Sequence, residues 1–110
     1  MLGMFPWTPH FFRCALAPLL FAGLPAASLA ADAANGKIIS KRWCSACHLV
    51  SPDQKTASAD VPGFAAIARK KLPQEQLRAF LMDPHPKMPD MNLTRSEIED
   101  ILAYIRSLNR

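Results

Sequence analysis

Apolar positions recur at helical spacing along the chain after residue 30, and no segment shows the alternation of a strand. The clearest apolar stripe lies near the C-terminus and consists of Ile98, Ile101, Leu102, Ile105 and Leu108. Thr94 and Glu97 stand at the two positions of a capping box, which predicts a helix that starts after Thr94. The pattern therefore indicates an all-α fold of three to four short helices.

Two helices are predicted in the first half of this region. The first covers about residues 34–47, and its apolar positions are Ile38, Ile39 and Trp43. A short second helix covers residues 62–69. Its inward side chains are predicted to be Phe64 and Ile67.

A third helix is predicted to begin at Pro73, because proline is allowed at the first helical position. It ends at Asp83-Pro84, since proline disfavours helix in the residue before it. Its apolar positions are Leu77, Phe80 and Leu81, and Met82 at its end is predicted to lie in the core. Residues 49–61 and 83–93 are predicted loops, and the second is stiffened by Pro84, Pro86 and Pro89.

Residues 1–30 have the pattern of a secretory signal peptide. Arg13 precedes an uncharged stretch over residues 14–31, which ends in the small residues Ser28-Leu29-Ala30. We expect cleavage after Ala30, export to the periplasm, and a mature domain of residues 31–110.

An uncleaved membrane anchor is the alternative for this segment, since a stretch of this length almost spans a bilayer. Cleavage is favoured because the stretch is interrupted by Pro18, Gly23 and Pro25. With the signal removed, no stable membrane insertion is expected.

Composition narrows the function without defining it. The chain has 13 Lys and Arg against 9 Asp and Glu, and a net charge of +4 is too small to indicate nucleic-acid binding. Three cysteines form an odd set, which argues against a disulfide framework. A domain as small as residues 31–110 has a marginal hydrophobic core, so another stabilising element is expected.

The sequence Cys44-Ser45-Ala46-Cys47-His48 is the C-x-x-C-H pattern of covalent c-type haem attachment. On a helical turn, positions i, i+3 and i+4 share a face, so both thiols can reach the two vinyl groups of one porphyrin. His48 then offers an imidazole to the iron. One covalent haem c would also supply the missing stabilising element.

Three other interpretations of the two cysteines fit less well. A thioredoxin-like redox pair needs a βαβ context, and the sequence predicts no strand. A structural zinc site needs four ligands, whereas Cys44, Cys47 and His48 supply three. A pair of buried structural cysteines would not require His48 beside it.

The sixth ligand of the iron has four candidates, Met82, Met88, Met91 and His85, of which Met82 is interpreted as a core residue. Met88 is favoured because it stands between Lys87 and Pro89 in the proline-stiffened loop, where a flexible apolar side chain gains little unless something binds it. A thioether on haem iron is one such use.

With these residues the chain resembles the small monohaem class I cytochromes c. Gly36 and Ile39 precede Cys44 as in the family's N-terminal helix, and residues 99–105 resemble its C-terminal helix. Met88-Pro89 matches the Met-Pro common in bacterial members. The resemblance implies helices wrapped around one haem c, with Gly36 and Ile39 packed on Ile101 and Tyr104.

One further role follows from the resemblance. The stretch Val61-Pro62-Gly63-Phe64 resembles the family segment whose proline carbonyl accepts the ring proton of the proximal histidine. This implies a hydrogen bond from His48 to the Pro62 oxygen, which would orient the ring and raise its basicity.

The predicted function is periplasmic electron transfer by a monomer, with His48 and Met88 as axial ligands and redox proteins as partners. With both axial positions filled, no site remains for substrate chemistry, so the protein is not expected to be an enzyme. Two alternatives stay open: a fixed cytochrome subunit of a dehydrogenase or oxidase complex, and an NO- or CO-binding protein. The resemblance also implies that the segments with Lys41, Arg42 and Lys87 flank the exposed haem edge, where they would attract an acidic partner.

Overall fold

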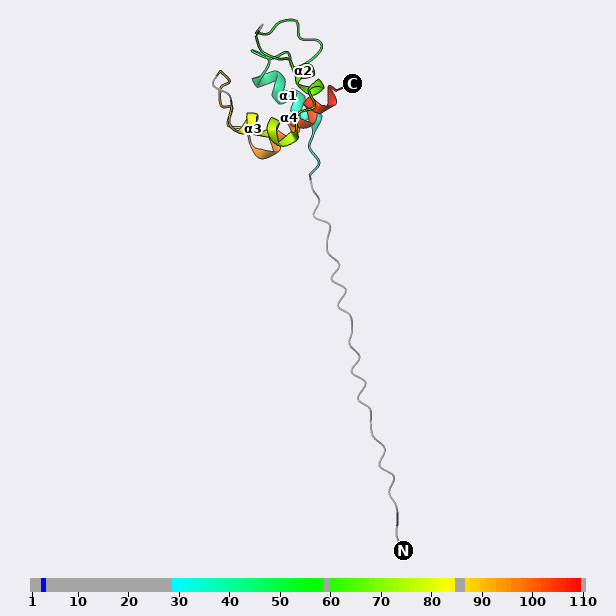
Figure 1. The fold of residues 1–110 in the computed structure, drawn as a ribbon. Helices are drawn as coiled ribbons and strands as arrows, with labels where there is room; N and C mark the ends of the chain where they lie inside the picture. The colour runs from blue at the N-terminus through cyan, green and yellow to red at the C-terminus, as the bar shows by residue number, and fades with distance from the viewer. Residues whose placement is uncertain (1–2, 4–28, 59, 85–86, 110) are drawn as a thin grey trace.

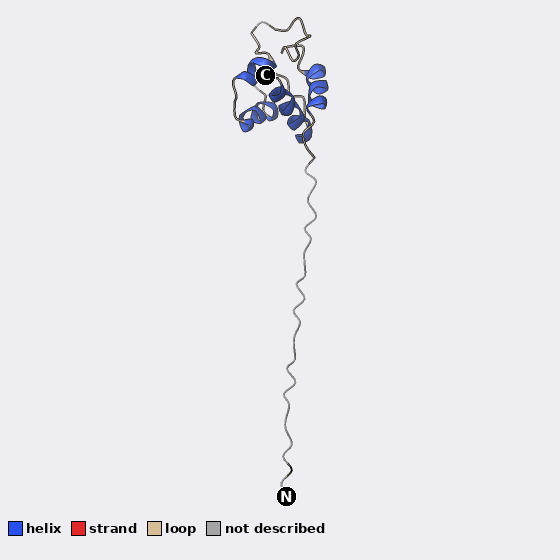
Figure 2. Ribbon diagram, turned by 90° about the vertical axis from the view of Figure 1, so that its right-hand side faces the viewer, coloured by secondary structure: helices blue, strands red, loops and turns tan. Residues whose placement is uncertain are grey.

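The computed structural model describes residue 3 and residues 29–58, 60–84 and 87–109. Residues 1–2 and 4–28, which include most of the predicted signal peptide and most of the stretch weighed as an anchor, lie outside the described residues. Within the described ranges the chain forms four helices and no strand, which confirms the all-α prediction (Figure 2). None of these helices is long and apolar enough to cross a membrane.

Helix α4 (Arg95–Ser107) lies at the centre of the fold, and the other three helices pack against it (Figure 1). The Thr94 hydroxyl accepts a hydrogen bond from Glu97 N, and the Glu97 carboxylate accepts one from Thr94 N at 2.8 Å. This is the predicted capping box. The predicted stripe is also confirmed, since its buried members are Ile98, Ile101, Leu102 and Ile105.

Helix α1 (Ala33–Trp43) crosses α4 at close range because of Gly36. A Cβ at Gly36 would overlap the carbonyl oxygen of Asp100 on α4. Ile39 shares one buried cluster with Ile101 and Tyr104, as the resemblance implied. The Asp100 carboxylate adds two hydrogen bonds across the crossing, from Asp32 N and Asn35 Nδ2.

The predicted end of α1 is wrong. The helix ends at Trp43 rather than near residue 47, and residues 44–47 form a turn. Only Ile39 of its three apolar positions is buried, whereas Ile38 is 59% and Trp43 50% exposed. The face toward α4 is the one that carries Gly36, and neighbouring positions on a helix point about 100° apart.

Helices α2 (Phe64–Arg69) and α3 (Gln74–Met82) cover the remaining sides of α4. Pro73 is the N-cap of α3 rather than its first helical residue. The Arg78 guanidinium fixes α3 on α4 by two hydrogen bonds to the Glu99 carboxylate, at 2.7 and 3.0 Å.

Met82 was predicted to lie in the core. This is wrong, because the residue is 65% exposed. Helix α3 buries Leu77 against α4, with Leu81 partly buried beside it. Met82 follows on the adjacent face, at the last turn of the helix, and so points away from this contact.

Candidate functional site

The turn Cys44–His48 continues directly from α1. Cys44 N donates to the Ser40 oxygen at 2.9 Å, and His48 N donates to the Cys44 oxygen at 2.9 Å. Cys47 N also donates to the Cys44 oxygen, at 3.2 Å. The backbone therefore keeps helix-like bonds through the C-x-x-C-H motif even though the regular helix ends at Trp43.

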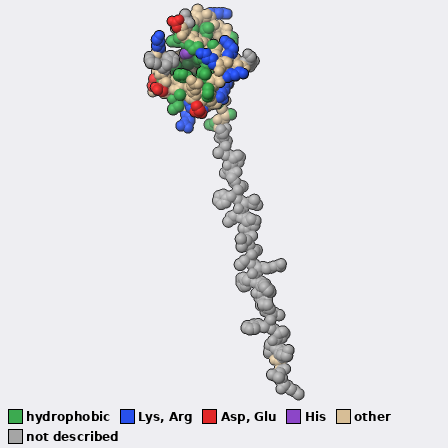
Figure 3. Space-filling model, viewed as in Figure 1, with side chains coloured by type: hydrophobic (Ala, Val, Ile, Leu, Met, Phe, Trp, Pro, Cys, Tyr) green, Lys and Arg blue, Asp and Glu red, His purple; other side chains and the backbone are tan. Residues whose placement is uncertain are grey.

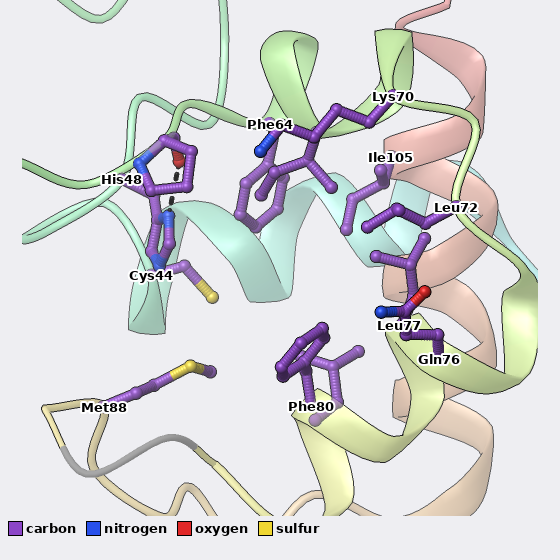
Figure 4. A pocket seen from close by; sticks show the side chains of 13 residues that line it. Cys44, His48, Phe64, Lys70, Leu72, Gln76, Leu77, Phe80, Met88 and Ile105 are labelled. Atoms are coloured by element: carbon purple, nitrogen blue, oxygen red, sulfur yellow. Dashed lines mark hydrogen bonds between the residues drawn. The ribbon is translucent and has the colours of Figure 1, made fainter.

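A cavity of about 400 Å³ opens beside this turn. Cys44, His48, Pro62 and Met88 line it, and His48 and Met88 approach it from opposite sides (Figure 4). Apolar side chains from the other helices form most of its remaining wall, including Phe64, Ile67, Leu77, Phe80 and Ile105. On the surface the cavity is a hollow among hydrophobic side chains beside His48 (Figure 3).

The other predicted site residues lie differently. Cys47 is exposed and is not part of the cavity wall. Met91 is partly buried outside the wall, and His85 lies outside the described residues. Among the described candidates for a sixth ligand, Met88 therefore has the position that faces His48.

The His48 ring is held by the segment before α2. Its Nδ1 lies 2.7 Å from the Pro62 carbonyl oxygen, and its ring centroid lies 5.6 Å from that of Phe64. Since a carbonyl oxygen only accepts, this contact requires a proton on Nδ1. In the neutral imidazole, Nε2 then keeps a lone pair that can bind a metal.

The two cysteine thiols form no disulfide with each other. Burial raises the pKa of the Cys44 thiol to about 11, and the nearby Cys47 adds to this shift. Reactive cysteines of redox pairs have the opposite property, a lowered pKa that favours the thiolate. The environment of Cys44 therefore does not resemble that of a catalytic thiol pair.

The residues around the cavity fit a covalently bound haem. The Cys44 thiol lies in the wall and the exposed Cys47 thiol belongs to the same turn, so both can form thioethers with one porphyrin. The His48 imidazole and the Met88 thioether lie on opposite sides of this largely apolar cavity. The cavity volume also falls within the range typical of cofactor sites, about 300–1,000 Å³.

Gln54 supports this site and was missed by the sequence analysis. Its side-chain Nε2 shares its two hydrogens among the backbone oxygens of Ser45 at 2.9 Å, His48 at 2.8 Å and Thr56 at 2.9 Å. Its Oε1 accepts from Val50 N at 3.0 Å. One side chain thus joins the attachment turn to the following loop, and no local sequence signal marks a glutamine for this role.

Two further hydrogen bonds hold the loop that follows the attachment turn, one between its two ends and one to α4. Phe64 N donates to the Leu49 oxygen at 2.8 Å, and the buried Tyr104 hydroxyl donates to the Val50 oxygen at 2.7 Å. Gly63 allows this closure, since a Cβ there would lie 3.2 Å from Leu49 Cβ. The backbone on the His48 side of the cavity is therefore fixed by interactions within the protein.

The predicted basic patch is partly neutralised. Lys41 Nζ lies 2.9 Å from an Asp53 carboxylate oxygen. Its hydrogen bond is the largest cause that lowers the pKa of Asp53 to about 2. Arg42 and Lys87 are both exposed.

Comparisons with known proteins agree with this site. The family model described as "Cytochrome C oxidase, cbb3-type, subunit III" matches residues 31–105. The chain is 52% identical over 91 residues to cytochrome c-552 of Bradyrhizobium diazoefficiens, which covers 82% of this chain and 88% of that protein. It is 34% identical over 105 residues to cytochrome c6 of Thermostichus vulcanus, which covers 84% of each chain. No solved structure matches.

The family match and the C-x-x-C-H motif together define the cofactor as covalently bound haem c. Proteins of this family carry electrons and do not convert a substrate. The chain therefore belongs to the family of small monohaem class I cytochromes c.

Proposed function

We propose that the protein is a periplasmic electron carrier whose haem c is attached through Cys44 and Cys47 and ligated by His48 and Met88. The observation that carries the proposal is the arrangement of His48 and Met88 on opposite sides of one largely apolar cavity. The haem supplies one-electron chemistry between Fe(II) and Fe(III). Two filled axial positions leave outer-sphere electron transfer as the reaction.

Each surrounding residue has a defined part in this function. The Pro62 oxygen accepts the Nδ1 proton of His48, which orients the ring and makes Nε2 a better donor. The Met88 thioether is a soft ligand that favours the reduced iron and raises the reduction potential. The apolar wall excludes water from the iron and limits reorganisation when the charge changes.

We further propose that residues 1–30 direct export and are removed, so that residues 31–110 act as a monomer. The supporting observation is the charge and small-residue pattern of the first 30 residues. The partners would be redox proteins that dock transiently, as is typical of electron-transfer encounters.

A fixed subunit of an oxidase complex is the second candidate. The observation that favours it is the matched family model, whose description names a subunit of an oxidase. A free carrier elutes alone as a monomer in gel filtration of a native extract, whereas a subunit co-purifies with its complex.

Intact mass and spectra of the purified holoprotein test the proposed function. We expect a chain starting at Ala31 plus one haem that survives acid–acetone extraction. We also expect a low-spin, six-coordinate spectrum in both oxidation states. A high-spin spectrum in either state would instead support a protein that binds NO or CO at an open iron.

A further inference from the structure

The wall of the haem cavity carries two polar side chains besides the proposed haem attachment and iron-ligand residues. Apart from Cys44, His48 and Met88, the polar side chains that line it are Lys70 and Gln76, and the rest of the described wall is apolar. Lys70 follows α2 and Gln76 lies in α3, and in Figure 4 Gln76 lies across the cavity from Cys44 while the Lys70 side chain extends over Phe64. The described wall thus carries a thiol from the turn after α1, one ammonium from the end of α2 and one amide from α3.

Local backbone structure turns Lys70 toward this cavity. Lys70 is the C-cap of α2, and the next residue, Lys71, has a φ of 50°. Lys71 lines a separate cavity beside Arg106 and Asn109. Two adjacent lysines of equal charge therefore face different parts of the molecule.

The chemistry of haem connects these observations. Its two vinyl groups lie on one edge and its two propionates on the opposite edge. Thioethers to Cys44 and Cys47 would hold the vinyl edge beside the turn after α1, and the propionates would then lie toward the wall formed by α2 and α3. A carboxylate in contact with an apolar wall is costly unless a partner satisfies it.

We infer that Lys70 and Gln76 bind the haem propionates, with the Lys70 ammonium as the charged partner and the Gln76 amide as a hydrogen-bond donor. This inference rests on the proposed function, because it needs haem c in the orientation that Cys44 and Cys47 impose. Lys70 forms no ion pair with the described residues, so its charge is not used within that part of the chain.

The pairing has a consequence for the redox properties. A lysine beside a propionate favours the ionised carboxylate and lowers its pKa. It also offsets the negative charge that stabilises Fe(III), so it raises the reduction potential. Among the described residues, no other Lys, Arg, Asp or Glu lines this cavity.

The test is the reduction potential of the holoprotein against pH for Lys70→Gln, with Lys71→Gln as the matched control. Lys70→Gln should lower the potential more than the control does and raise the proton affinity of a propionate by about tenfold. Lys70→Arg should keep the wild-type dependence of the reduction potential on pH. Equal curves for Lys70→Gln and Lys71→Gln would show an ordinary surface lysine and overturn the inference.

Gln76→Glu is a second and independent variant. Its carboxylate should raise the proton affinity of the propionate, as Lys70→Gln should, because two neighbouring negative charges repel each other. If neither Lys70→Gln nor Gln76→Glu moves the curve, the propionates are bound elsewhere. An intact low-spin His/Met spectrum in these samples would then leave the proposed function standing.

Discussion

The loop over residues 49–63 and the loop over residues 83–93 each serve one proposed iron ligand, yet they are held in different ways. Gln54, Tyr104 and the bond between Phe64 and Leu49 fix the first loop against the attachment turn and α4. In the described part of the second loop, residues 87–91 form no hydrogen bond with another element.

The difference indicates how the two ligands are supplied. His48 is oriented by protein groups that do not depend on the iron, through the Pro62 oxygen and Gln54. Met88 lies in a proline-rich segment, and we expect its bond to the iron to fix this segment against the cavity. The His48 side should therefore control folding, and the Met88 side should control the properties of the iron.

Loss of a thioether to the haem should have the largest effect, because the His48 side and the Met88 side of the cavity both depend on the attached haem. Cys44→Ser or Cys47→Ser removes a covalent link that a small domain needs for stability. We expect the yield of folded holoprotein to fall sharply, measured by haem staining and acid–acetone extraction. Ala46→Ser, in the same motif, should keep a normal yield, and a normal yield for Cys44→Ser would contradict covalent attachment.

The helix crossing that supports the His48 side should be the next most sensitive. Gly36→Ala places a Cβ against the Asp100 carbonyl, and overpacking of this kind costs about 3 kcal/mol. Guanidinium unfolding of the holoprotein measures the change. Lys37→Ala, at an exposed position of α1, should change the free energy of unfolding by less than about 0.5 kcal/mol. Equal stability of the two variants would argue against the close crossing.

Gln54→Ala should have a moderate effect confined to the His48 side. It leaves the backbone groups of His48 and Val50 without their partner, which costs about 1–3 kcal/mol. Unfolding of the holoprotein should detect this loss, while Met88 should stay bound to the iron. Lys55→Ala, the exposed neighbour, is the control, and the role of Gln54 fails if both variants unfold at the same denaturant concentration.

The smallest effect concerns partner docking near the Met88 side. Electron transfer to the physiological partner should slow as ionic strength rises, because steered association is screened by salt. Lys87→Glu should lower the association rate severalfold in stopped-flow experiments. Lys37→Glu, away from the haem cavity, should lower it less. A rate that depends on neither salt nor Lys87 would favour an apolar docking face.

Local signals explain which parts of the fold were predictable. The capping box and the apolar stripe of α4 were predictable because all their residues lie within one segment of the chain. The residues of the C-x-x-C-H motif are also close together in the sequence. The exposure of Met82 was not predictable, because it depends on which face of α3 meets α4.

The network of Gln54 was not predictable for a related reason. Its bonds to Ser45 and His48 depend on the path by which the loop returns to the attachment turn. An amide side chain in a loop has no pattern that separates this role from ordinary solvent exposure.

The central claim is that His48 and Met88 ligate one covalent haem from opposite sides, and Met88→Ala tests it most directly. The oxidised variant should lose the methionine-to-iron charge-transfer band, show a lower reduction potential and bind added imidazole, while it remains folded. Met91→Ala should keep the band and the wild-type potential. Loss of the band in Met91→Ala and its retention in Met88→Ala would contradict the proposed ligand set.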